Sequence, residues 1–191
     1  MNKTLIIVDA QYDFMEGGKL PVAGATVALN NIADYLNTGE VSLAITTQDW
    51  HIGKHESFKE QGGDFPEHCV KGTHGADIYE PILEAIQKNN ILHYNLKKGE
   101  FVEEFSAFLH KVKDYSHWKE YLTTDADSPY IQFHDEEQII ICGLAGDICV
   151  MNTALALKES NPVIADNLTA SLDDGNFRAL ASQHGITLVE V

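Results

Sequence analysis

Short apolar runs alternate with longer amphipathic segments along this chain. Most of the runs are unbroken and rich in Ile, Val and Leu, which is typical of strands covered on both faces. Between them, apolar positions recur at helical spacing. The predicted strands are Thr4–Val8, Val41–Thr47, Ile91–Asn95, Gln138–Gly143, Pro162–Ile164 and Ile186–Val191, and the predicted helices are Ala25–Asn37, Glu80–Lys88, Val102–Val112, Val150–Ser160 and Asp174–His184.

This alternation predicts an α/β fold with a mostly parallel, Rossmann-like sheet of six strands. Right-handed crossovers would place helices on both faces, which gives a three-layer α/β/α arrangement. The chain has 191 residues and shows no repeat or interdomain linker, so we expect one domain over residues 1–191. Ligands of such sheets bind beyond the carboxyl ends of the strands.

Composition narrows the range of partners. The formal net charge is −16, which disfavours a nucleic-acid backbone or an anionic membrane as partner. There is no apolar run of about 18 residues and no signal-peptide pattern at the start, so we expect no membrane span and a cytoplasmic location. The three cysteines, an odd number, form no disulfide framework; they are Cys69, Cys142 and Cys149.

The segment from Ile139 to Val150 carries the strongest chemical signal. A β-type run stops at a Gly-Leu-Ala-Gly turn, and Cys149 follows where a helical pattern begins. Unpaired N–H groups at a helix start lower the pKa of a thiol and can hold an oxyanion. A buried, inert cysteine explains this segment equally well when it is taken alone.

Other strand ends bring further reactive groups to the same edge of the sheet. Asp9 follows the first strand and could accept a thiol proton, while Lys98 follows the third and could stabilise a thiolate. Taken alone, Asp9 would be a turn residue and Lys98 a surface lysine. Together with Cys149 they supply a nucleophile, a base and a charge partner.

A second group of residues has the composition of a metal site. Asp49 and His51 lie at the end of the second strand, and His68 follows in a long loop that we expect to be functional. One carboxylate and two imidazoles leave coordination positions open for water or substrate. A structural role is the alternative for each histidine. His55, Asp64 and His74 could be further ligands or support the first three, and Cys69 is interpreted as a packing residue.

The motifs resemble those of the isochorismatase-like cysteine hydrolases over nearly the whole length, and within that family those of the nicotinamidases (pyrazinamidases). The metal residues separate this group from isochorismatases and carbamoylsarcosine-type amidohydrolases, which share the triad but lack the metal set. The matching blocks are Val8–Phe14, Gly17–Val22, Asp49–Phe58, Phe65–Ala76, Lys98–Phe108 and Gly143–Val150.

The resemblance implies a role for each matched residue. The catalytic triad would be Asp9, Lys98 and Cys149, and one divalent metal, zinc before iron or manganese, would bind Asp49, His51 and His68. The amides of Ala145 and Cys149 would form an oxyanion hole beside a cis peptide between Leu144 and Ala145. The substrate would contact Phe14, Phe65, Trp50 and Leu144.

The implied reaction is metal-dependent hydrolysis of nicotinamide to nicotinate and ammonia through a thioester, a step of NAD salvage. Pyrazinamide is a second expected substrate, and a homo-oligomer is compatible with the family. Three positions depart from its pattern: Phe65 stands in place of Trp, and Gly146 and Ile148 in place of Thr and Tyr. We therefore expect a wider or less polar acyl pocket. Segment 113–134 matches no family block.

Three alternatives stay open at this point. The chain could be an amidase of the same family acting on another small amide, or a catalytically silent member that serves as an interaction subunit. A non-hydrolytic Rossmann-type binding protein would need a glycine-rich phosphate loop after the first strand, where Asp9-Ala10-Gln11 stands instead.

Overall fold

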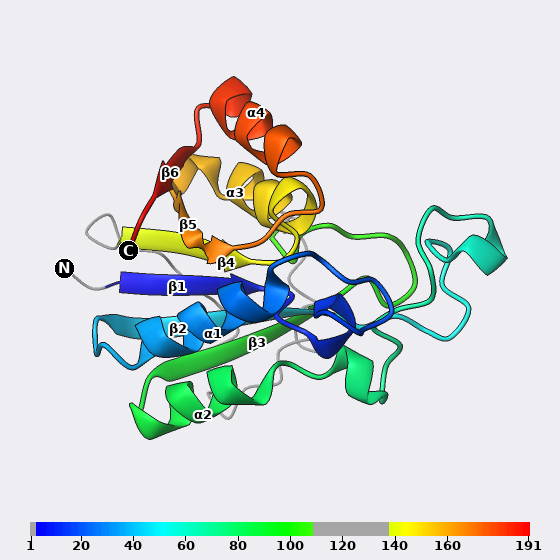
Figure 1. Cartoon of the computed structure of the whole chain (residues 1–191), viewed down its shortest axis with the longest axis horizontal. Helices are drawn as coiled ribbons and strands as arrows, with labels where there is room; N and C mark the ends of the chain where they lie inside the picture. Colours follow the sequence, from blue (N-terminus) through cyan, green and yellow to red (C-terminus); the bar gives the residue numbers. More distant parts are fainter. Residues whose placement is uncertain (1–2, 109–137) are drawn as a thin grey trace.

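A computed structural model describes residues 3–108 and 138–191 of the chain (Figure 1). In these ranges six parallel strands form one sheet in the order β3-β2-β1-β4-β5-β6. The strands are β1 (Lys3–Val8), β2 (Val41–Asp49), β3 (Leu92–Lys98), β4 (Gln138–Gly143), β5 (Val163–Thr169) and β6 (Thr187–Val189), and the helices are α1 (Ala25–Leu36), α2 (Glu80–Lys88), α3 (Met151–Ala156) and α4 (Asp174–His184).

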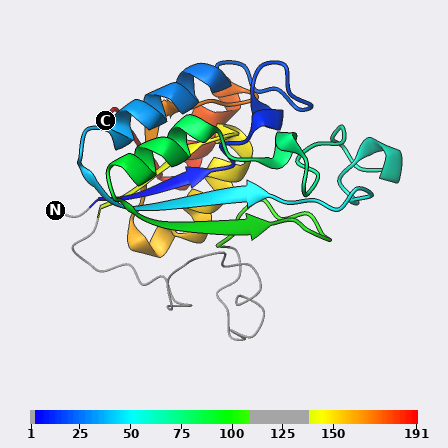
Figure 2. The ribbon, with the colours of Figure 1, turned by 90° about the horizontal axis from the view of Figure 1, so that it is seen from below.

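Two apolar cores lie on opposite faces of the sheet because side chains alternate along each strand. In β1, Leu5 and Ile7 point into the core under α1 and α2, while Ile6 and Val8 point into the core under α3 and α4. All four are fully buried. Figure 2 shows α1 and α2 together on one side of the strands. The expected three-layer α/β/α fold is confirmed.

The strand order contains a switch point between β1 and β4, the two central strands. Chain connections leave these strands in opposite directions, so their carboxyl ends border a crevice, as in other doubly wound sheets. The loop that follows β2 extends beyond the strand ends on this same side (Figure 2). Residues that follow β1 and β4 are therefore placed next to each other.

Several strands differ in length from the prediction. β2 continues to Asp49 and β3 to Lys98, and these two residues are paired in the parallel register. β5 is longer than the predicted Pro162–Ile164, and β6 is shorter than Ile186–Val191. The hydropathy pattern misses the polar ends of β2, β3 and β5 because it identifies only their apolar centres.

The predicted helix Val102–Val112 is wrong over its described part. Residues 102–108 form bends and turns, and residues 109–112 lie outside the described ranges, as does segment 113–134. Side chains here bond to backbone instead of leaving it free to form a helix. Glu104 accepts a hydrogen bond from the Gly99 N–H (2.9 Å), and Ser106 Oγ accepts one from the Phe108 N–H (3.1 Å).

The predicted helix Val150–Ser160 begins earlier and is divided. A π-helical turn, η5 (Gly146–Val150), comes first, then α3, then a 3₁₀ turn, η6 (Lys158–Ser160). Short 3₁₀ turns η1 (Tyr12–Phe14), η2 (Lys59–Gln61) and η3 (His74–Ala76) lie in the long loops. No helix of the described ranges is long and apolar enough to cross a bilayer.

Candidate active site

The side chain of Lys98 lies between three other buried groups at the carboxyl ends of β1, β2 and β4. Its Nζ is 2.8 Å from Asp9 Oδ2 and 3.7 Å from Cys149 Sγ, and it also donates to Asp49 Oδ1. The structure therefore brings together the three residues that the sequence predicts as a triad. It also joins them to a predicted metal ligand, a contact that the sequence does not reveal.

Asp9 is held in one orientation by its neighbours. Its backbone takes a positive φ of 47°, which a non-glycine residue adopts rarely. The Asp9 N–H donates to Thr47 O, and Thr47 Oγ1 donates to Asp9 Oδ1 at 2.6 Å. The second carboxylate oxygen is thus left to face Lys98.

Burial sets the acid–base properties of this group. It raises the pKa of Asp9, although the Lys98 ammonium opposes the shift. Burial also raises the pKa of the Cys149 thiol well above its usual value, although the Lys98 ammonium opposes this shift as well. Burial alone would lower the pKa of Lys98, but the Asp49 and Asp9 carboxylates hold it well above normal. The resting cysteine is therefore a neutral thiol beside a carboxylate of increased basicity.

The turn before Cys149 contains the expected cis peptide between Leu144 and Ala145. Ala145 and Cys149 both line a cavity of about 380 Å³, counted with the space at its open mouth. The placement is compatible with the predicted oxyanion hole, which stays a prediction.

Aromatic and aliphatic side chains form most of the cavity wall. Phe14 and Phe65 are part of it, as predicted for the substrate contacts. The structure places the other two predicted contacts elsewhere: Leu144 is fully buried in the core, and the Trp50 ring lies under Lys97, whose Nζ is 3.5 Å from the ring centroid. The remaining apolar wall residues are Leu20, Val22, Phe105, Ile148 and Leu172.

Two of the three positions that depart from the family pattern, Ile148 and Gly146, have different consequences. Ile148 lines the cavity and makes this part of its wall apolar, in agreement with the expected decrease in polarity. Gly146 does not widen the cavity. A Cβ at Gly146 would lie 2.2 Å from Ser171 Oγ and 3.0 Å from Thr169, so the glycine allows β5 and its following loop to approach.

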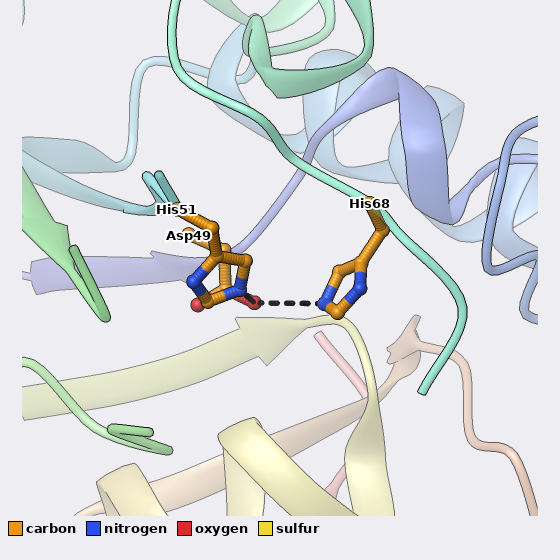
Figure 3. A group of neighbouring side chains, drawn as sticks. All are labelled: Asp49, His51 and His68. Carbon is orange, nitrogen blue, oxygen red and sulfur yellow. Dashed lines mark ion pairs between the residues drawn. The ribbon is translucent and has the colours of Figure 1, made fainter. Parts of the chain in front are cut away.

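The predicted metal ligands meet beside this cavity (Figure 3). Asp49 Oδ2 is 3.6 Å from His51 Nε2 and 3.8 Å from His68 Nε2. All three side chains are buried, and one ligand atom from each lies within 4.8 Å of the others. Within the described residues, the only other such group combines Asp9, Asp49 and Cys149.

The surroundings of the histidines fit a metal ion. His51 Nδ1 bonds to Gly99 O, and His68 Nδ1 bonds to Pro66 O at 2.8 Å. A carbonyl partner requires the proton on Nδ1, so Nε2 keeps its lone pair for a metal. His51 Nε2 is fully buried with no hydrogen-bond partner. Burial alone would raise the pKa of Asp49, but the Lys98 ammonium holds it well below its usual range, so this ligand is anionic.

The other candidate ligands lie outside this cluster. His55 is fully buried and stacks on His51, with ring centroids 4.2 Å apart and Nδ1 2.8 Å from Ser57 Oγ. It supports the orientation of His51. Asp64 is exposed, and the exposed His74 ring packs on Tyr12. Cys69 is buried, as predicted for a packing residue.

Two residues of the site are missed by sequence reasoning. Gln11 Nε2 donates to Asp49 O and Gln11 Oε1 accepts from the Asp49 N–H, both at 2.8 Å, so this amide fixes the backbone of a metal ligand. Glu103 lines the cavity, and its Oε2 is buried without a hydrogen-bond partner. A glutamine two residues after Asp9 is a usable signal, whereas Glu103 lies in a segment that was predicted as helix.

Comparisons with known proteins agree with this geometry. Residues 3–184 match the family model described as the isochorismatase domain. The chain belongs to the isochorismatase family. The expected family, stated above from its motifs, is thereby confirmed.

Similar members of the isochorismatase family share about three residues in ten with this chain. It is 31% identical to the nicotinamidase of Escherichia coli over 80% of this chain and 75% of the relative. It is 30% identical to the nicotinamidase/pyrazinamidase of Mycobacterium tuberculosis over 80% and 76%. The crystal structure of PnC1 from L. infantum in complex with nicotinate superposes with a TM-score of 0.77 at 28% identity, over 99% of this chain and 92% of that one.

Proposed function

We propose that this protein is a cysteine amidohydrolase that converts nicotinamide to nicotinate and ammonia. Curated relatives at about 30% identity are named nicotinamidases, and a structural relative at 28% identity binds nicotinate. The observation that carries the proposal is the position of Lys98, which contacts Asp9 and Cys149 on one side and Asp49 on the other. Reactive groups and metal ligands thus adjoin one cavity.

The acylation step follows from the buried thiol. Asp9 takes the proton of Cys149, and the sulfur attacks the amide carbon as the Ala145 and Cys149 N–H groups hold the oxyanion. The C–N bond then breaks, and the protonated Asp9 gives its proton to the nitrogen, which leaves as ammonia. Lys98 keeps its charge throughout and compensates the charge on Asp9 or on the sulfur.

Hydrolysis of the thioester completes the cycle. Asp9 removes a proton from water, the resulting oxygen nucleophile attacks the acyl carbon, and the C–S bond breaks. The sulfur recovers its proton from Asp9, and the acid product leaves as nicotinate after its remaining proton passes to solvent. The neutral resting thiol is restored, as burial favours.

The metal site adds binding chemistry. Asp49, His51 and His68 would hold one divalent ion, for which zinc suits the set of one carboxylate and two imidazoles. When bound, the ion would act as a Lewis acid for a ring nitrogen of the substrate. The rings of Phe14 and Phe65 would flank the substrate in the cavity.

The test is ammonia release from nicotinamide by the purified protein, measured as isolated, after chelation and after metal return. We expect turnover that falls on chelation and recovers with zinc. Cys149→Ala should abolish turnover and keep the metal, whereas Cys142→Ala serves as a matched buried cysteine outside the reacting group. Full turnover in Cys149→Ala would contradict the proposal.

The same experiment also distinguishes nicotinamide from another carboxamide substrate. No release from nicotinamide, with release from another small carboxamide that Cys149→Ala abolishes, would keep the cysteine chemistry and replace the substrate. The apolar Ile148 in the cavity wall is the feature that favours such a result.

A further inference from the structure

Asp13 is a buried carboxylate that the proposed chemistry does not use. It lies in η1, four residues after Asp9, and is 8% exposed. Both of its oxygens accept backbone hydrogen bonds: Oδ2 from the Cys69 N–H at 2.7 Å and Oδ1 from the Lys19 N–H at 3.3 Å. The first bond reaches the residue directly after the metal ligand His68.

Cys69 takes a backbone conformation that an L-residue with a side chain adopts only under constraint. Its φ is +46°, in the left-handed region that favours glycine. While its N–H donates to Asp13, its carbonyl accepts from the His51 N–H at 3.0 Å. The peptide groups of Cys69 therefore connect Asp13 to the backbone of both histidine ligands.

The other side of the Asp13 carboxylate is closed by Gly75. A Cβ at this glycine would lie 2.2–2.3 Å from the carboxylate atoms of Asp13. The φ of Gly75 is not in the left-handed region, so the close approach is what requires glycine here. Asp13 thus fits into a gap of the metal-binding loop.

We propose that Asp13 is a positioning residue that sets metal affinity by holding the Cys69 turn, and through it His68, in place. The inference rests on the metal site of the proposed function. Phe14, the next residue in η1, packs on His68 with ring centroids 5.6 Å apart, so η1 supports this ligand at two points. Groups that orient metal ligands typically contribute about 10–100-fold to affinity.

The experiment measures zinc affinity of the full chain without substrate, by competition with a chromophoric chelator. Asp13→Ala and Gly75→Ala should each weaken zinc binding by about 10–100-fold. Asp13→Asn should lose less, because its amide oxygen can still accept the Cys69 N–H. Gly53→Ala is the control: its Cβ would meet nothing within 4 Å, so zinc affinity should not change.

A rescue variant separates positioning from general loss of stability. Glycine adopts a positive φ without strain, so Cys69→Gly should restore most of the affinity that Asp13→Ala loses. Cys69→Gly alone should change zinc affinity little. The d–d spectrum of bound Co²⁺ reports ligand geometry, and it should change in Asp13→Ala and return in the double variant.

Three results would overturn the inference. The first is wild-type affinity in a folded Asp13→Ala variant. The second is a loss that Cys69→Gly does not recover, because a merely structural role predicts a larger loss in the double variant. A wild type that binds no zinc would reject this inference and the proposed metal site together, whereas zinc binding without nicotinamide hydrolysis would reject only the proposed substrate.

Discussion

The ammonium group of Lys98 lies 2.8 Å from a carboxylate oxygen of Asp9, and both side chains are almost completely buried. The same ammonium donates to Asp49. One cation therefore compensates two buried anions, one from the proposed acid–base group and one from the proposed metal site.

Replacing this lysine should have large effects on stability and activity. Lys98→Met leaves Asp9 and Asp49 without a buried counter-charge, so we expect a loss of about 3–5 kcal/mol in unfolding free energy. Turnover should fall at least about a hundredfold. Urea unfolding and ammonia release measure the two effects. Lys97→Met, one residue earlier on the half-buried side over Trp50, should change stability by about 1 kcal/mol or less. Equal losses in the two variants would contradict the role of Lys98.

The reactivity of Cys149 provides a separate test of Asp9. The pKa of the thiol is raised by burial and, in addition, by the negative charge of Asp9. Only the thiolate is alkylated, so the rate with iodoacetamide should be low at neutral pH and increase toward alkaline pH. Asp9→Asn removes the charge, which lowers the thiol pKa and should speed alkylation at neutral pH while turnover is lost. A pH dependence of alkylation that Asp9→Asn leaves unchanged would contradict this arrangement.

Glu103 should influence the release of a carboxylate product. Burial raises its pKa, and its carboxyl group lines the cavity. Above that raised pKa, Glu103 is anionic and disfavours nicotinate, so Glu103→Gln should bind nicotinate about 3–10-fold more tightly. The difference should shrink as pH falls and Glu103 takes up a proton. Nicotinate inhibition at several pH values measures this, and Glu100→Gln, paired with Lys71 outside the cavity, is the control.

Glu16 should contribute a pH-dependent part of stability. It accepts hydrogen bonds from the Gly24 and Thr26 N–H groups at the start of α1, where Gly24 offers no capping side chain. The hydrogen bond from the Thr26 hydroxyl is the main cause that lowers the pKa of Glu16 to about 2. Because the folded-state pKa is depressed, the stabilisation is complete above the unfolded value of 4.5 and disappears as pH falls toward 2. Glu16→Gln should cost about 0.5–1 kcal/mol at neutral pH, allowing for its exposure, and almost nothing near pH 2.

Unfolding curves from pH 2 to pH 7 would measure this difference. Glu60→Gln, an exposed carboxylate of η2, should leave the pH dependence unchanged. A constant difference between Glu16→Gln and the wild type across the range would contradict the assignment.

The apolar strands predict the fold, and the polar residues at the strand ends predict which residues share the site. The hydropathy pattern does not show which of these polar residues face the site, and the alternation of side chains along each strand explains this. Thr47, Asp49 and His51 point to one side and contact site residues, whereas Trp50 points away from the cavity. For the same reason Lys98 faces Asp9, whereas its neighbour Lys97 lies over Trp50.

The remaining features depend on contacts between distant segments. The helical pattern at 102–108 is overridden by a contact with a distant loop, in which the Glu103 N–H donates to Glu56 Oε1 at 2.9 Å. Gly146 appears from sequence to enlarge the cavity, yet Ser171 fills the space beside it. In the sequence Asp13 resembles an ordinary turn residue, because only the fold brings the Cys69 N–H to its carboxylate.

The central pairing of β1 with β4 has a consequence for how the site forms. Asp9, the three metal ligands and Lys98 all lie in the first 98 residues, on strands β1, β2 and β3 and the loops that follow them. Cys149 arrives only when β4 closes a much longer loop onto β1, and long loop closures slow folding. During refolding, zinc binding should therefore recover before ammonia release, so that the chain acquires its ion first and its nucleophile last.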